Sequence, residues 1–285
     1  MASLRFGALV LAYNQEEYIS YCLRALSPHV DCIAVVFSEY PWTAYNARAR
    51  EMFCVADRTR DILTGLSRQL ANLIIIEGQW EREEDMRNDG LRELRRAGMD
   101  VCLSIDADEF YPDGGVERLK TAISARNARG TRYYVPYLGC FKRFDHLLET
   151  RYQEENGQVY PFMRGAVAVH LDADTHFYYG RHTTGSSIDL PPTFFFWHMG
   201  YVLSDERMWE KVHSWAHAFE LLPDWFEDKW RRWTPQTRDL HYRNPAWRWP
   251  RTVKIDPRIL PRILHAHPYF PGQAAHLGAE SATVS

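Results

Sequence analysis

The chain has 285 residues, 46% of them hydrophobic and 25% charged, with a formal net charge of −3, which is ordinary for a soluble globular protein. Its longest amino-terminal apolar run, Phe6–Tyr13, is too short to span a bilayer and lacks the cleavage pattern of a signal peptide. The five cysteines are scattered without C-x-x-C spacing, which argues against a disulfide framework or a cysteine zinc site and predicts reduced thiols in the cytoplasm.

The amino-terminal part of the chain alternates apolar runs of strand length with helical patterns. Its strands are predicted at Leu4–Leu11, Cys32–Phe37, Leu73–Ile76 and Val101–Ile105. Its helices are predicted from Asn14, from Ala44 to about Leu70, and at Glu81–Ala97. Asn14 and Glu17 have the spacing of a capping box, so we expect Asn14 to cap the first helix. Strands alternating with helices predict a parallel sheet, and hence an α/β fold.

The regularity changes after Phe110. A short helix is predicted at Val116–Arg126, followed by strand-like runs at Thr131–Tyr137, Val159–His170, His176–Tyr179 and Thr193–Trp197. A longer helix is predicted at Asp205–Leu222, with a buried face formed by Trp209, Val212, Ala216 and Phe219. A parallel first half followed by a mixed second half suggests a nucleotide-binding half joined to an acceptor-binding half.

The most informative stretch is VCLSIDADEF, residues 101–110. A strand that is apolar on both faces belongs in the middle of a sheet, and Asp106, Ala107 and Asp108 follow its carboxyl end. Open α/β sheets bind their ligands at that edge. Crowded carboxylates there are typical of a site in which a hard divalent cation bridges substrate phosphates, although D-x-D also occurs by chance in solvated loops.

Four segments in this order resemble the glycosyltransferases of the GT-A fold, in particular the family-2-like group. They are LVLAYNQEEYISYCLRAL at the first strand and helix, CIAVVFSEY at the second strand, the run Met86–Leu91 with its Arg-Asn-x-Gly pattern, and LSIDADEF. The resemblance covers roughly residues 4–112. It implies a GT-A-type α/β fold and transfer of a sugar from a nucleoside diphosphate sugar to a hydroxyl acceptor, with Mn²⁺ or Mg²⁺ as cofactor.

The resemblance also implies roles for individual residues. The metal would be held by Asp106, Asp108 and His198, the last of which ends the aromatic run FFFWHMGY. Asp108 would also serve catalysis through the metal. The residues expected to line the donor site are Ala12, Tyr13, Asn14, Glu16, Glu39, Arg87, Asn88, Asp106 and Ala107. The expected divisions are a nucleotide-sugar half (1–112), an acceptor half with the metal-ligand histidine (113–228), a basic tryptophan-rich extension (229–271) and a flexible tail (272–285).

A second D-x-D follows the apolar run 166–171. It could be the real metal site, an acceptor-side carboxylate pair or part of a plain loop. Asp172 or Asp174 could also be the base that deprotonates the acceptor. Inverting and retaining chemistry both stay open. Arg181, after a Tyr-Tyr-Gly turn, could hold a diphosphate or be an ordinary surface charge.

The segment Lys229–Arg262 contains ten Lys or Arg and only two acids, interleaved with tryptophans. This composition suits an anionic partner, or else tryptophans that cover the sheet and arginines that pair with acids elsewhere. The favoured acceptor is a glycan or lipid-linked glycan. The alternatives are a hydroxymethylated base in DNA and a non-catalytic nucleic-acid-binding protein. A nucleotidyltransferase is disfavoured, because AYNQEEY has neither the glycine nor the lysine of a phosphate-binding loop.

Overall fold

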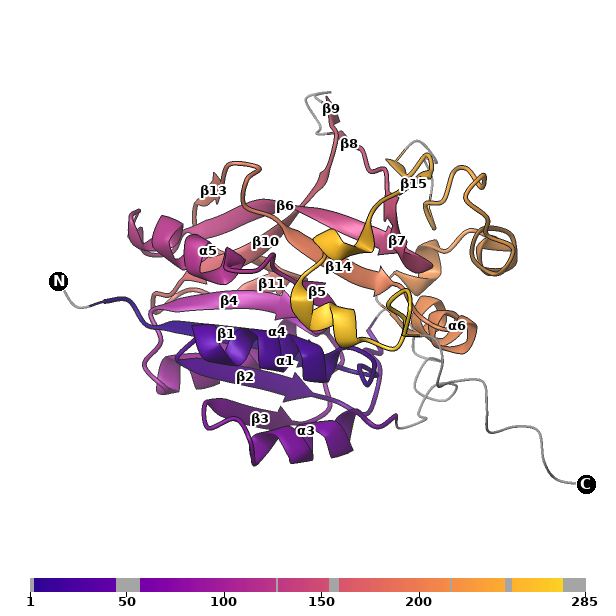
Figure 1. Ribbon diagram of the computed structural model, residues 1–285. Coiled ribbons are helices and arrows are strands. Elements are labelled where there is room, and N and C mark those ends of the chain that lie inside the picture. The colour runs from indigo at the N-terminus through magenta and orange to yellow at the C-terminus, as the bar shows by residue number, and fades with distance from the viewer. Residues whose placement is uncertain are drawn as a thin grey trace, which may run out of the picture.

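The computed structural model describes residues 3–44, 57–126, 128–153, 159–215, 217–243 and 248–273. Its centre is an 11-stranded sheet whose main path runs in the order β15-β7-β6-β10-β4-β1-β2-β3. This arrangement confirms the predicted α/β class, with a parallel amino-terminal part and a mixed second part (Figure 1). Within the described residues, no helix is long and apolar enough to cross a membrane.

The parallel part of the sheet comes from the first 106 residues. Its strands are β1 (Phe6–Ala12), β2 (Cys32–Phe37), β3 (Leu73–Glu77) and β4 (Val101–Asp106). The connecting helices are α1 (Ile19–Leu26), α3 (Thr59–Ser67) and α4 (Glu83–Arg96). Because β1 pairs in parallel with both β2 and β4, the carboxyl ends of these strands lie at one edge.

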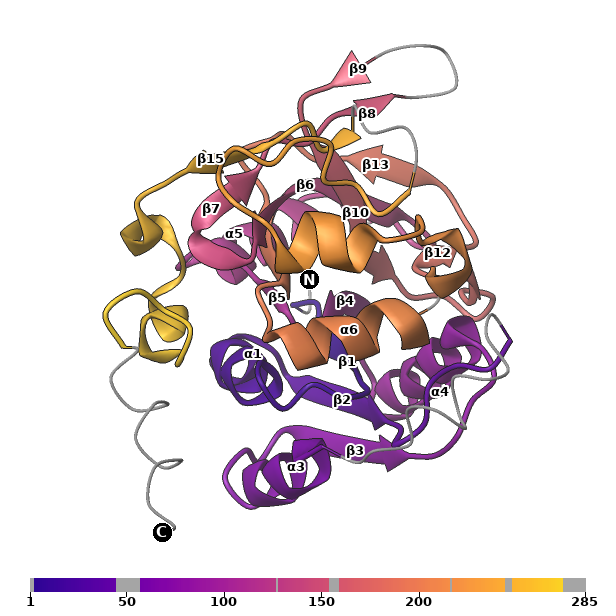
Figure 2. The same cartoon turned by 90° about the vertical axis from the view of Figure 1, so that its right-hand side faces the viewer.

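Strand β1 is buried on both faces, and its successive side chains point alternately into two hydrophobic cores, one on each side of the sheet. Ala8 and Val10 face the larger core, to which α1, α3 and α5 (Gly115–Ser124) contribute. Leu9 and Leu11 face the smaller core under α4. Figure 2 shows α1 and α3 on one side of the sheet and α4 on the other.

The second half extends the same sheet. Its larger strands are β6 (Arg132–Phe141), β7 (Arg143–Leu148), β10 (Met163–His170) and β14 (Phe196–Tyr201). Its short strands in this sheet are β5 (Glu109–Phe110), β13 (Ser187–Asp189) and β15 (Thr252–Lys254). Two separate two-stranded sheets are formed by β11 (Phe177–Tyr179) with β12 (His182–Thr183) and by β8 (Tyr152–Gln153) with β9 (Val159–Tyr160). Strand β10 runs antiparallel to β4, and β14 pairs with β5 and β6. The sheet is therefore continuous across the division expected at residue 112.

Helix α6 (Asp205–Ser214) lies across the edge of the sheet to which β1 and β4 point (Figure 2). It begins at the Ser204 cap, whose hydroxyl accepts the Arg207 amide. The predicted helix was longer, and its predicted buried face is confirmed at Val212 but wrong at Trp209 and Phe219. Met208 and Val212 are the buried apolar residues, whereas Trp209 and Phe219 are 41% and 69% exposed and Ala216 lies outside the described residues.

The tryptophan-rich carboxyl-terminal segment packs against the second half. Trp225, Trp230 and Trp249 form an aromatic core with Phe141 and Tyr201. Strand β15 then pairs with β7, which fixes the segment to the sheet edge. The tryptophans thus cover the sheet, the second of the two readings of this composition. The expected flexible tail lies almost entirely outside the described residues.

Two local predictions at the amino-terminal end are corrected. Asn14 does not cap a helix, because α1 begins only at Ile19 and Asn14 occupies the left-handed region at φ 50°. Helix α3 lies in the stretch predicted helical from Ala44 to Leu70, but residues 45–56 of that stretch, including Cys54, lie outside the described residues.

Candidate functional site

A cavity of about 510 Å³ opens at the carboxyl ends of β1 and β4. This volume is within the range of small-molecule sites, and the position is the one that open α/β sheets use for ligands. Asp106 and Asp108 line it from the end of β4, Tyr13 and Asn14 line it from the turn after β1, and His198 lines it from β14.

Asp106 is held by two arginines. One carboxylate oxygen accepts a hydrogen bond from Arg87 at 2.8 Å, and the other lies 2.5 Å from Arg181. Arg181 also pairs with Glu109 at 2.7 Å. From the turn between β11 and β12, Arg181 therefore bridges the carboxylates of Asp106 and Glu109. Burial opposes ionisation of Asp106, but the charges of Arg181 and Arg87 outweigh it and keep its pKa well below the ordinary range. Burial, by contrast, raises the pKa of Glu109.

Arg87 acts on the site through its neighbours. Its side chain is only 1% exposed, and its guanidinium donates to Glu83, Ser104 and Asp106. The sequence led us to expect a direct contact with the donor. Arg87 does line the cavity, and its contact with Asp106 fixes that carboxylate at the end of β4.

Asp108 lies beside a lysine and a histidine. Its Oδ2 accepts a hydrogen bond from Lys211 Nζ at 3.0 Å, and its Oδ1 is 3.7 Å from His198 Nε2. Lys211 also donates to the Gly200 carbonyl at 3.0 Å. Burial opposes ionisation of Asp108, but Lys211 and His198 lower its pKa overall, so the carboxylate is charged at neutral pH. Burial lowers the pKa of His198, which favours the neutral imidazole.

Gly200 makes this convergence possible. A Cβ atom at this position would lie 2.7 Å from Asp108 Oδ2, from His198 Cε1 and from Lys211 Nζ. Real Cβ atoms essentially never approach heavy atoms so closely, so any side chain would displace at least one of these groups. The glycine is thus a steric requirement of the site.

The donor set at Asp108 fits a divalent cation in part. Asp108 Oδ1 and neutral His198 Nε2 are close enough to bind one ion together, and Mg²⁺ is commonly held by one or two protein ligands with waters and substrate phosphates. The described residues contain no cluster of three or more His, Cys, Asp or Glu side chains that could hold a metal. Asp106, which we expected as a ligand, has both oxygens on arginines.

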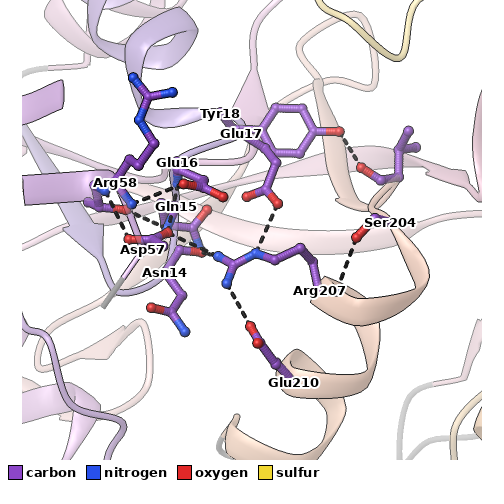
Figure 3. A network of polar contacts seen from close by, with 12 residues as sticks. Asn14, Gln15, Glu16, Glu17, Tyr18, Asp57, Arg58, Ser204, Arg207 and Glu210 are labelled. Carbon is purple, nitrogen blue, oxygen red and sulfur yellow. Dashed lines mark hydrogen bonds and ion pairs between the residues drawn. The ribbon is translucent and has the colours of Figure 1, made fainter. Parts of the chain in front are cut away.

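Arg207 of α6 ties the two halves of the chain together (Figure 3). Its guanidinium pairs with Glu17 at 2.9 Å and Asp57 at 3.0 Å, and it donates to the Asn14 carbonyl at 2.9 Å. Glu210, one turn along α6, accepts from the same guanidinium at 2.6 Å. These contacts hold α6 over the turn that follows β1.

The cavity-facing stripe of α6 was missed in the sequence. It consists of Arg207, Glu210, Lys211 and Ser214, which all line the cavity. Their spacing of i, i+3, i+4 and i+7 is a helical face, so the signal was present as a polar stripe.

The other expected donor residues fall into three groups. Tyr13 and Asn14 line the cavity, and Ala12 and Ala107 are buried beside it at the ends of β1 and β4. Glu16 and Glu39 do not line it, since they contact the Arg58 amide and the Arg60 guanidinium. Asn88 also points elsewhere: its amide exchanges two hydrogen bonds with the Phe177 backbone and so anchors β11 on α4.

Asp172 and Asp174 are separated from the site, which corrects their expected catalytic role. They follow β10, whose last residue, His170, pairs with Val101 at the amino end of β4. The length of β4 therefore lies between them and Asp106, about 16 Å at 3.3 Å per residue. The side chain of Asp172 instead accepts from Thr175 and the Asp174 amide within its own loop.

The basic carboxyl-terminal segment carries cations that are paired locally. Six of its arginines contact carboxylates, in the pairs Arg231–Glu227, Arg232–Asp228, Arg243–Glu220, Arg251–Glu149, Arg258–Asp256 and Arg262–Asp113. Among the described tryptophans of the segment, Trp230 and Trp249 are buried and Trp233 is partly buried. Trp247 lies outside the described residues.

No protein-family model matches the chain, and no curated protein matches it. Among solved structures, S. aureus TarS 1-349 aligns at 15% identity and a TM-score of 0.44, over 73% of this chain and 63% of that chain. Its complex with UDP-GlcNAc aligns at 17% identity and a TM-score of 0.37, over 59% of this chain and 45% of that chain. Mannosyltransferase PcManGT from Pyrobaculum calidifontis, in complex with GDP-Man and Mn²⁺, aligns at 17% identity and a TM-score of 0.34, over 50% of this chain and 37% of that chain. The chain spans less than two thirds of each structure, and at these overlaps its function must be inferred from the site itself.

Proposed function

We propose that this protein is a glycosyltransferase that moves a sugar from a nucleoside diphosphate sugar to a hydroxyl acceptor with the help of Mn²⁺ or Mg²⁺. The observation that carries the proposal is the convergence of Asp108, His198 and Lys211 in a cavity at the carboxyl ends of β1 and β4. The order of motifs in the first 112 residues supports the same function.

The charges in the cavity suit a leaving diphosphate. Asp108 and His198 would hold the divalent cation, which when bound would stabilise the negative charge that develops on the departing phosphates. Lys211 and Arg181 add fixed positive charge to the same wall, and they are pre-organised by Asp108, Asp106 and Glu109. Because these cations are already oriented, the site need not reorganise when charge develops.

The acceptor would enter from the side of α6 and the aromatic core. Trp215, Tyr242 and Trp249 line that part of the cavity, beyond Ser214 of the α6 stripe. Aromatic faces bind the apolar faces of sugar rings, which favours a glycan or lipid-linked glycan as the acceptor. A hydroxymethylated base in DNA stays the alternative acceptor.

A thermal-shift screen tests the proposed function. UDP-, GDP-, CMP- and dTDP-sugars are added with and without Mn²⁺, since a ligand that binds only the folded state raises Tm. At a ligand concentration of 100 times Kd, binding stabilises the folded state by about 2.7 kcal/mol. We expect one nucleotide class to raise Tm in a Mn²⁺-dependent manner and Asp108→Asn to abolish the shift. Asp174→Asn, at the opposite sheet edge, is the matched control and should keep it. The absence of any nucleotide-dependent shift in the wild type would contradict the proposal.

A further inference from the structure

Lys211 places a permanent positive charge beside the expected metal ligands. Its ammonium donates to Asp108 Oδ2 and to the Gly200 carbonyl, each at 3.0 Å. It reaches this position from α6, across the cavity from β4. The Asp108 side chain is only 7% exposed, so its charge needs a partner, and Lys211 supplies one in the absence of any ligand.

The carboxylates nearest to Asp108 are already paired with guanidinium groups. Asp106 is already matched by Arg87 and Arg181, and Glu109 shares Arg181. A divalent ion between Asp108 Oδ1 and His198 Nε2 would therefore lie close to an ammonium in a poorly solvated site. Like charges at such separations repel strongly where the dielectric constant is low.

From this we propose that Lys211 is a tethered cation that competes with the divalent ion for Asp108, so that metal binds tightly only together with the diphosphate of the donor. The inference rests on the proposed function for the identity of that diphosphate. An incoming diphosphate brings further negative charge next to Lys211, so it offsets the repulsion and attracts both Lys211 and the metal. Metal and diphosphate then raise each other's affinity by the same factor, as linkage requires.

The test measures Mn²⁺ binding directly, by the electron paramagnetic resonance signal of free Mn²⁺ in the absence of nucleotide. Lys211→Gln is the main variant, because the amide can still donate to Asp108 and Gly200 but carries no charge. Lys211→Met is a second variant without the hydrogen bonds. Lys120→Gln on α5, which pairs with Glu117 away from the site, controls for the change in net charge.

We expect Lys211→Gln and Lys211→Met to bind Mn²⁺ at least about tenfold more tightly than the wild type, with Lys120→Gln unchanged. Inorganic pyrophosphate should tighten Mn²⁺ binding in the wild type by a larger factor than in Lys211→Gln. Asp108→Asn combined with Lys211→Gln should lose the gain.

Unchanged or weaker Mn²⁺ binding in Lys211→Gln would overturn the proposal and make Lys211 a group that only orients Asp108. The same outcome follows if neither variant binds Mn²⁺. If the Mn²⁺ affinities of the variants follow the expected order but no nucleotide sugar raises Tm, the proposed function is overturned while the competition by Lys211 stands. The two failures are therefore distinguishable.

Discussion

Gly200→Ala tests whether the convergence of Asp108, His198 and Lys211 depends on a missing side chain. The added methyl group would lie 2.7 Å from an atom of each of these residues. Ordinary contact begins at 3.4 Å, so each atom must recede by 3.4 − 2.7 = 0.7 Å. Binding constellations tolerate errors of only about 0.5 Å, so the displacement is large enough to disrupt the site.

The matched control is Gly139→Ala on the neighbouring strand. Gly139 pairs with His198 in the sheet, and a Cβ there would meet Leu148 Cδ1 at 3.5 Å and the His198 carbonyl at 3.8 Å, which are ordinary contacts. Alanine in an extended strand is favoured over glycine by about 0.5–1 kcal/mol, so Gly139→Ala should be neutral or slightly stabilising. Overpacking costs about 1–3 kcal/mol, which the same gain reduces to about 0–2.5 kcal/mol, so Gly200→Ala should be less stable than Gly139→Ala.

Two measurements separate the variants. Urea denaturation followed by tryptophan fluorescence gives the free energy of unfolding, and the Mn²⁺-dependent thermal shift with the nucleotide sugar identified in the screen reports the site. We expect Gly200→Ala to lose both stability and the ligand-induced shift, and Gly139→Ala to retain both. If the two variants are indistinguishable in both assays, the steric reasoning about Gly200 is refuted.

Two further predictions concern stability. Gly90→Ala should destabilise the protein by about 1–3 kcal/mol, because its Cβ would lie 2.1 Å from Leu9 Cδ1 and 2.6 Å from Val36 Cγ2. The control Gly65→Ala in α3 meets nothing within 4 Å and should stabilise the protein by about 1 kcal/mol. Equal effects of the two substitutions on the free energy of unfolding in urea would count against this account of α4 packing. His267 is buried, which lowers its pKa to about 4 from an ordinary 6.5, so the unfolded chain binds the additional proton between these values. The stability that neutral His267 contributes is therefore fully present above pH 6.5 and is lost as the pH falls toward 4, at about 1.4 kcal/mol per pH unit. His267→Gln should reduce the slope of the free energy of unfolding against pH by that amount in this range. An unchanged slope would contradict the prediction.

The sequence by itself determined the parallel part of the fold and one half of the site. The apolar run at Val101–Ile105 predicted a strand buried on both faces, and its end placed Asp106 and Asp108 at the ligand-binding edge, as the structure confirms. His198 was expected beside Asp108 and lies there. The strand and its two aspartates could be placed because burial and periodicity are local properties, which a single stretch of residues displays in full. His198 was expected only from the family resemblance.

The tertiary structure decided which charges meet. Lys211 and Arg181 reach the two aspartates from elements more than 70 residues away in the chain, and no local pattern encodes those contacts. The direction of β10 also had to be known, since its antiparallel course carries Asp172 to the opposite edge. Strand direction and long-range ion pairing arise from how the elements assemble around a common core, so they become visible only when the chain is folded.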